Sequence, residues 1–226
     1  AGLARVLRHN GDFDGAEPLY WKALEVRRKL FGDPHPDVAH SLNHLARLYI
    51  QKGDPARAEP LAREGLAMRI KLFGEHHAET VASQSNLAGI LIERGEIAEG
   101  ERLYRRSLDS LRQQLGPGHP YVAAATYSVA RAVSARGAHE EAIPIYRESL
   151  RLHREALPED HPDTARVAVG LATALLESGG RREAEALLVG ALRVQTQRYG
   201  ENASPVATTR KLLERARGGT GNVSRQ

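Results

Sequence analysis

The chain has 226 residues, 41% of them hydrophobic, 27% charged and 5% aromatic, which is enough to bury a sizeable core. The mean hydropathy is −0.45, and no run of 18 consecutive apolar residues occurs, so the composition argues against a membrane-spanning helix. The net charge is a mild +4, and the absence of cysteine excludes disulfides, thiolate zinc sites and a cysteine nucleophile within this segment.

A period of 42 residues organises the whole sequence. One column of the repeat contains histidine: His35, His77, His119 and His161. Another contains glycine: Gly11, Gly53, Gly95, Gly137 and Gly179. Two further columns contain small residues: Ala16, Ala58, Gly100, Ala142, Ala184 and Ala4, Ala46, Ala88, Ala130, Ala172. Several independent columns at one spacing indicate a repeat architecture.

The elements follow one another in a fixed order. A truncated helix ends near Asn10, and its partner runs from about Asp14 to Phe31, giving a partial first repeat over residues 1–32. Four complete repeats follow at 33–74, 75–116, 117–158 and 159–200, each with a first-type and a second-type helix. A terminal capping helix is predicted over 205–217 and a flexible tail over 218–226. The sequence therefore predicts an all-α chain of about eleven helices with one solenoid over residues 1–217.

The first complete repeat illustrates the signals. Apolar residues such as Val38, Leu42 and Leu45 recur three and four residues apart between residues 36 and 52, which is the helical period. Gly53 fits a left-handed helix end, and Asp54 fits the N-cap of the next helix. Because neither helix can bury its apolar stripe alone, stacked hairpins must bury it together. A large side chain in a small-residue column should force adjacent helices apart.

These residues resemble the tetratricopeptide repeat, in the 42-residue variety of kinesin light chains and many bacterial proteins. The matching text is GDPHPDVAHSLNHLARLYIQKGDPARAEPLAREGLAMRIKLFG and its three successors, which cover nearly the whole chain. The resemblance implies a right-handed superhelix whose first-type helices line a concave groove that takes up a peptide or a partner protein. Bacterial relatives are often sensing or scaffolding parts of larger chains that carry nucleotide-binding switch domains, caspase-like proteases or kinases.

Mapping the groove-facing stripe onto this sequence gives a set of candidate partner-binding residues. They are Arg5, His40, Asn43, His44, Arg47, Ser85, Asn86, Gly89, Tyr127, Arg131 and Arg166. Arg5, Arg47 and Arg131 share one column and offer guanidinium groups to carboxylates. Small residues between Arg47 and Arg131 predict a recess with Tyr127 as one wall. The hypothesis is an extended ligand with acidic residues flanking a bulky apolar one; the alternative is that these side chains are merely solvated.

Metal binding and catalysis find little support in the sequence. The repeated histidines should lie on the order of 10 Å apart, because one helix pair separates successive copies, whereas zinc ligands must reach one ion. We interpret them as structural and expect no metal and no cofactor. No phosphate-binding loop, His-Glu-x-x-His or Gly-x-Ser-x-Gly motif occurs, so we expect no enzyme.

The predicted function is a protein–protein interaction scaffold. An alternative is a sensor, regulatory or assembly arm of a multidomain bacterial effector with a nucleotide switch or a protease; nucleic-acid binding through the arginines is the weaker reading. The chain starts at Ala1 without Met, and no signal peptide or membrane segment is visible, so we expect a cytoplasmic piece of a larger chain. Trp21 has no aromatic counterpart in its column, and whether it is packed or an exposed anchor stays open.

Overall fold

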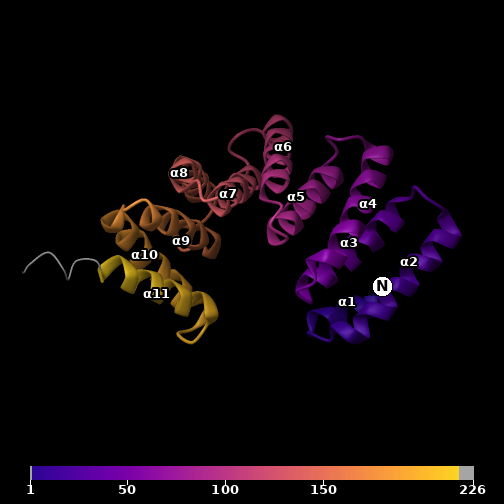
Figure 1. Cartoon of the computed structure of the whole chain (residues 1–226), viewed down its shortest axis with the longest axis horizontal. Helices are drawn as coiled ribbons and strands as arrows, with labels where there is room; N and C mark the ends of the chain where they lie inside the picture. Colours follow the sequence, from indigo (N-terminus) through magenta and orange to yellow (C-terminus); the bar gives the residue numbers. More distant parts are fainter. Residues whose placement is uncertain (1, 219–226) are drawn as a thin grey trace, which may run out of the picture. The chain divides into compact units, whose positions relative to one another are not determined.

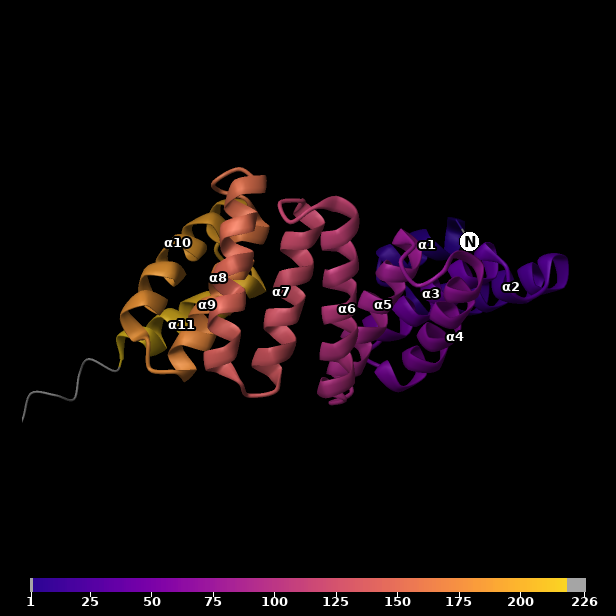
Figure 2. The same ribbon diagram turned by 90° about the horizontal axis from the view of Figure 1, so that it is seen from above.

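A computed structural model describes residues 2–218, and in this part of the chain the secondary structure is entirely helical (Figures 1 and 2). The helices are α1 (Gly2–His9), α2 (Phe13–Phe31), α3 (Pro36–Gln51), α4 (Pro55–Phe73), α5 (Ala78–Glu93), α6 (Ile97–Leu115), α7 (Pro120–Ala135), α8 (His139–Ala156), α9 (Pro162–Glu177), α10 (Arg181–Tyr199) and α11 (Ser204–Arg217). The prediction of an all-α fold with eleven helices is confirmed for the described residues.

The chain divides into two compact units, residues 1–110 and 111–226, with the boundary inside α6. The continuous array over residues 1–217 stays a prediction. The first-type helix expected at 36–52 ends one residue earlier, with Lys52 as its C-cap, and the last helix begins at Ser204. Of the expected flexible tail at 218–226, residues 219–226 lie outside the described residues.

Within each unit, first-type helices are buried on two sides. In α3, Ala39 and Leu48 are both fully buried, and because they are nine residues apart they lie on opposite sides of the helix. The small-residue column is buried at Ala4, Ala46 and Ala88 in the first unit and at Ala130 and Ala172 in the second. Small side chains at these positions let the paired helices approach closely, as the repeat pattern predicts.

The repeated histidines begin the first-type helices. The ring Nδ1 of His35 accepts a hydrogen bond from the backbone N–H of Asp37 at 3.2 Å, and His161 accepts from Asp163 at the same distance. His77 and His119 are N-caps of the same kind. An accepting Nδ1 places the proton of the neutral ring on Nε2. The structural role expected for this column is thus confirmed. The histidines cap backbone N–H groups that have no partner within the helix.

The second-type helices begin differently. Asp54 caps α4 by accepting from the backbone N–H of Arg57 at 3.0 Å, and Asp12 caps α2 in the same manner. Gly53, which links α3 to α4, has φ +75°, a left-handed conformation that side chains with a Cβ rarely adopt. Both features agree with the sequence prediction for the turn between the two helices.

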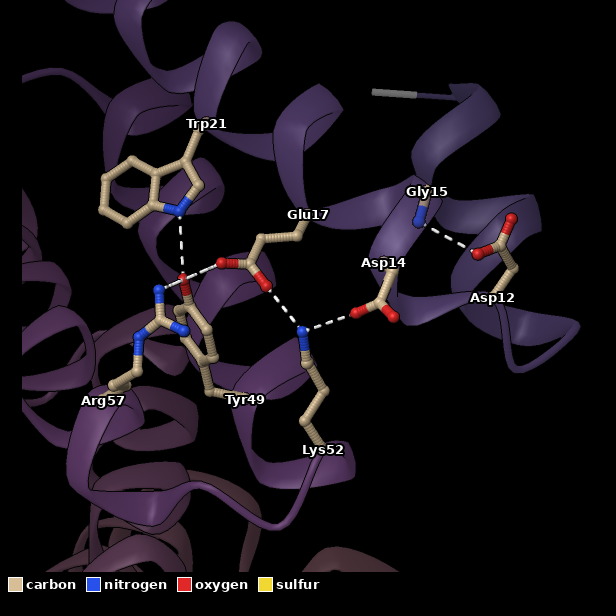
Figure 3. A network of polar contacts seen from close by, with 8 residues as sticks. All are labelled: Asp12, Asp14, Gly15, Glu17, Trp21, Tyr49, Lys52 and Arg57. Carbon is tan, nitrogen blue, oxygen red and sulfur yellow. Dashed lines mark hydrogen bonds and ion pairs between the residues drawn. The ribbon is translucent and has the colours of Figure 1, made fainter.

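A polar network joins α2, α3 and α4 around the hydroxyl of Tyr49 (Figure 3). This hydroxyl donates to Glu17 at 2.7 Å and accepts from the indole N–H of Trp21 at 3.0 Å and from Arg57 at 2.6 Å. Lys52 bonds the other oxygen of Glu17 at 2.7 Å. These bonds, first that of Lys52 and then that of Tyr49, hold the pKa of Glu17 below its usual value. Trp21 is 40% exposed, but its polar end is fixed by α3.

Candidate functional site

One groove in the first unit collects most of the predicted binding residues. We name it the α3–α5 groove; its cavity volume is about 490 Å³. Seven candidate residues line it: His40, Asn43, His44, Arg47, Ser85, Asn86 and Gly89. Ala46, Ile50, Ile90 and Glu93 come from the same two helices, Ala62 from α4 and Tyr104 from α6.

The groove is open because a small residue replaces a large one in one column of the repeat. In this column of the second-type helices stand Tyr20, Ala62, Tyr104, Tyr146 and Leu188. The ring of Tyr20 stacks on His44 of the next first-type helix, with ring centroids 5.5 Å apart. Tyr146 fills the equivalent space in the second unit so closely that a Cβ on Gly170 would lie 2.7 Å from its ring. Ala62 lacks this ring, so the space between α3 and α5 stays unfilled.

Five polar side chains of the groove have no hydrogen-bond or ion-pair partner among the described residues. In the described part of the chain, the side chains of Asn43, Arg47, Ser85, Asn86 and Glu93 make no hydrogen bond or ion pair. Asparagine amides offer donors and an acceptor, as a peptide backbone requires, and Arg47 offers a planar donor set to carboxylates. The groove therefore offers hydrogen-bond donors and acceptors to a peptide backbone and a positive charge to an acidic side chain.

His44 is kept neutral inside this groove. Partial burial, followed by the positive groups of His40, Arg8, Arg27 and Arg47, lowers the pKa of His44 from 6.5 to about 4. The His40 and His44 rings meet edge to face with centroids 5.0 Å apart. A carboxylate bound beside His44 would reverse this effect, because a negative charge favours the protonated ring.

We expect the stability of the chain to fall as the pH is lowered from 6.5 towards 4. In this window the unfolded chain protonates His44 while the folded chain keeps it neutral, so the unfolded state binds more protons and the free energy of unfolding rises with pH. The measurement is urea unfolding across this range for the wild type and for His44→Gln. The variant should lose part of the pH slope; identical slopes would show that His44 titrates alike in both states.

Three predicted residues belong to the second unit and form a cluster there. The guanidinium groups of Arg166 and Arg131 lie 5.1 Å and 5.9 Å from the centre of the Tyr127 ring, in cation–π geometry. Burial raises the pKa of Tyr127 above its usual value. Arg166 also pairs with Asp163 at 2.8 Å. A shared recess that includes Tyr127 and Arg131 stays a prediction.

Arg5 is exposed on α1 and does not line the α3–α5 groove. The wall beside Gly89 is Tyr104, whose hydroxyl would lie 3.1 Å from a Cβ at this glycine. Sequence reasoning missed Ala62 and Tyr104 because it followed the first-type helices alone. The tyrosine column of the second-type helices contained the signal, since Ala62 interrupts it.

Stacked two-helix hairpins define the class of helical-repeat proteins. A family model described as tetratricopeptide repeat matches residues 1–71, 79–155 and 135–197. The chain belongs to the tetratricopeptide repeat family, whose fold generally serves as a protein–protein interaction scaffold and is typically not enzymatic.

Solved structures place the chain among kinesin light chain-like repeats. One solved structure is a Podosopora anserina protein of kinesin light chain type, whose own TPR-like repeats are nearly identical to one another. It is 27% identical to this chain with a TM-score of 0.76, and the match covers 87% of this chain and 92% of that one. BtubC (BKLC) from P. vanneervenii is 23% identical, with a TM-score of 0.75 and coverage of 90% and 81%. The apo form of RapI, at 14% identity and a TM-score of 0.75, covers 96% and 80%. The last two likenesses concern the fold alone.

A search of the curated proteins gives no match for this sequence. Across residues 2–218, none of the helices combines the length and the apolar character needed to cross a bilayer.

Proposed function

We propose that this chain is a protein-interaction scaffold that binds an extended peptide in the α3–α5 groove. The observation that carries the proposal is the gap left by Ala62, since Tyr20 and Tyr146 fill the same place elsewhere. An apolar ligand side chain seated there would contact Ala46, Ile50, Ala62 and Ile90, which line the groove. Burial of such a side chain contributes about 1.5–3 kcal/mol before the costs of ordering the peptide.

The charges of the groove favour a polarised ligand. Arg47 has no carboxylate partner in the described residues and suits an acidic ligand residue. Glu93 lies on the same groove and disfavours a second acidic residue beside it. The proposed ligand therefore has a bulky apolar residue with an acidic neighbour directed to Arg47, and its acidic side faces away from Glu93.

The ion pairs of the protein support a protein partner over nucleic acid. Many arginines already bind carboxylates of the chain, such as Arg63 with Glu99 at 2.8 Å and Arg147 with Glu183 at 2.8 Å. Arginines held this way are not available to phosphates. A role as the regulatory or assembly arm of a larger bacterial effector stays a prediction and would use the same groove.

We expect Ala62→Tyr to abolish peptide binding while preserving the fold, because three repeats already carry tyrosine in this column. A random 12-residue peptide library is selected on the wild type, and the enriched peptides are measured on the variants by fluorescence anisotropy. Affinity should fall at least tenfold on Ala62→Tyr and on Arg47→Glu, which corresponds to about 1.4 kcal/mol or more.

Arg198→Glu is the matched control for Arg47→Glu, because Arg198 is exposed on α10, makes no ion pair in the described residues and does not line the α3–α5 groove. The proposal is wrong if no enriched peptide binds the wild type more tightly than Ala62→Tyr.

A further inference from the structure

A second groove lies in the other unit, between the second-type helices α8 and α10. We name it the α8–α10 groove. Its main cavity, of about 670 Å³, has an apolar floor that includes Leu150, Ala165, Leu187 and Val194. A second cavity of about 460 Å³ adjoins it and shares Leu150, Arg154, Glu183 and Leu187. The charged side chains on its rim can be compared with those at the equivalent positions of the other repeats.

Second-type helices in successive repeats are joined by ion pairs 36 residues apart. Arg28 pairs with Glu64 in the first unit, and Arg112 pairs with Glu148 at 2.9 Å in the second. These arginines share one column, which contains Ile70 between them and continues to Arg154. The glutamates share another, which contains Arg106 between them and continues to position 190. Position 190 is glycine, so the pair that the repeat would form there is missing.

The missing carboxylate leaves Arg154 without an ion pair among the described residues. A Cβ on Gly190 would meet nothing within 4 Å, so the place of the absent side chain is empty. Arg154 lines both cavities and lies beside the apolar floor. A guanidinium group at the edge of an apolar groove is suited to a carboxylate from outside the chain.

The equivalent place in the first unit is filled by the protein itself. There, Arg106 occupies the column of Gly190 and pairs with Glu75 at 2.6 Å, and Ser110 contacts His76 at 3.1 Å. In the second unit the residue equivalent to Glu75 is Glu159, which lines the groove and has no ion pair in the described part of the chain. The α8–α10 groove lacks both of these contacts, and its own internal ion pair joins Arg193 to Asp160 at 2.7 Å.

A buried hydroxyl without a partner, a feature that Thr80 shares in the same column of the repeat, also lines the main cavity. The Thr164 side chain lines the main cavity, its residue is 7% exposed, and its hydroxyl has no hydrogen-bond partner in the described residues. Unsatisfied buried hydroxyls cost free energy, and a polar ligand atom can satisfy them.

We propose that the α8–α10 groove binds a segment of a partner protein that presents an aliphatic side chain over Gly190 and a carboxylate to Arg154. The ligand carboxylate takes the place that Glu64 and Glu148 hold in two other repeats. The aliphatic side chain covers Leu150, Leu187 and Val194, and Glu159 favours a basic residue at its end of the groove. This surface is distinct from the α3–α5 groove, so the two grooves can bind different segments.

The decisive variant is Gly190→Glu, which supplies the missing carboxylate from within the chain. We expect its Tm to rise, because glutamate is a better helix former than glycine and pairs with Arg154. A random 12-residue peptide library is selected on the wild-type chain and counter-selected on Gly190→Glu. Peptides that discriminate the two should carry an acidic and an aliphatic residue and lose at least tenfold in affinity on Gly190→Glu and on Arg154→Gln.

Two controls separate this groove from the other. Ala62→Tyr should leave the affinity of these peptides unchanged, and so should Arg198→Gln on the exposed side of α10. The proposal is overturned if no enriched peptide distinguishes the wild type from Gly190→Glu, if the discriminating peptides lack an acidic residue, or if Gly190→Glu lowers the Tm. Loss of binding on Ala62→Tyr alone would support the α3–α5 groove and contradict this one.

Discussion

Replacing Ala88 by leucine is expected to lower the free energy of unfolding by about 2–3 kcal/mol, through overpacking. Ala88 is fully buried on α5, and α6 approaches it so closely that a methyl group on Gly100 would lie 2.8 Å from the Ala88 carbonyl oxygen. Three further carbon atoms cannot enter this contact without moving one helix away from the other. The measurement is urea unfolding followed by circular dichroism.

Ala98→Leu provides the matched control, because Ala98 is exposed on α6 and undergoes the same chemical change. It should alter the free energy of unfolding by no more than about 0.5 kcal/mol. If Ala88→Leu unfolds at the same urea concentration as the wild type, the register of the small-residue column is wrong.

Removing the Tyr49 hydroxyl, in Tyr49→Phe, should lower the free energy of unfolding by about 2 kcal/mol, because it takes away hydrogen bonds to charged groups. Tyr49 is 1% exposed, and its hydroxyl binds Glu17, Trp21 and Arg57 together. The change leaves the indole N–H of Trp21 without its partner on α3. Trp21 is the single tryptophan of the chain, so its fluorescence reports the local change directly.

Tyr121→Phe removes the same atom from a side chain that is 66% exposed, and its effect should be close to zero. Equal stability of Tyr49→Phe and the wild type would mean that water replaces the hydroxyl at no cost. The network would then contribute orientation of Trp21 and no net stability.

The candidate binding site was only partly predictable from the sequence. The stripe of α3 and α5 follows from helical periodicity, and seven residues of that stripe line the α3–α5 groove. The depth of the groove depends on Ala62, which comes from α4, and on Tyr104, which comes from α6. Periodicity within one helix does not show which side chain of a neighbouring helix reaches the same space, so this part needed the tertiary structure.

The α8–α10 groove was also only partly predictable from the sequence. The 42-residue period assigns Arg154 and Gly190 to their columns, but it does not show that residues of these two columns, 36 positions apart, lie next to each other in space. The ion pairs of Arg28 with Glu64 and of Arg112 with Glu148 establish that they do. The glycine at position 190 can be recognised as a missing partner of Arg154 only when these ion pairs are known.

By itself, the sequence determined the helical repeat, its 42-residue period, the number and order of the helices and the columns of small residues, because these follow from local periodicity and from steric limits on close helices. The tertiary structure decided which polar groups are already satisfied and which are left for a ligand. His35 caps a helix and Arg147 binds Glu183, whereas Arg47 and Arg154 have no ion pair in the described residues. Hydrogen bonds and ion pairs join residues from different helices, and their completion depends on distances that no single segment determines.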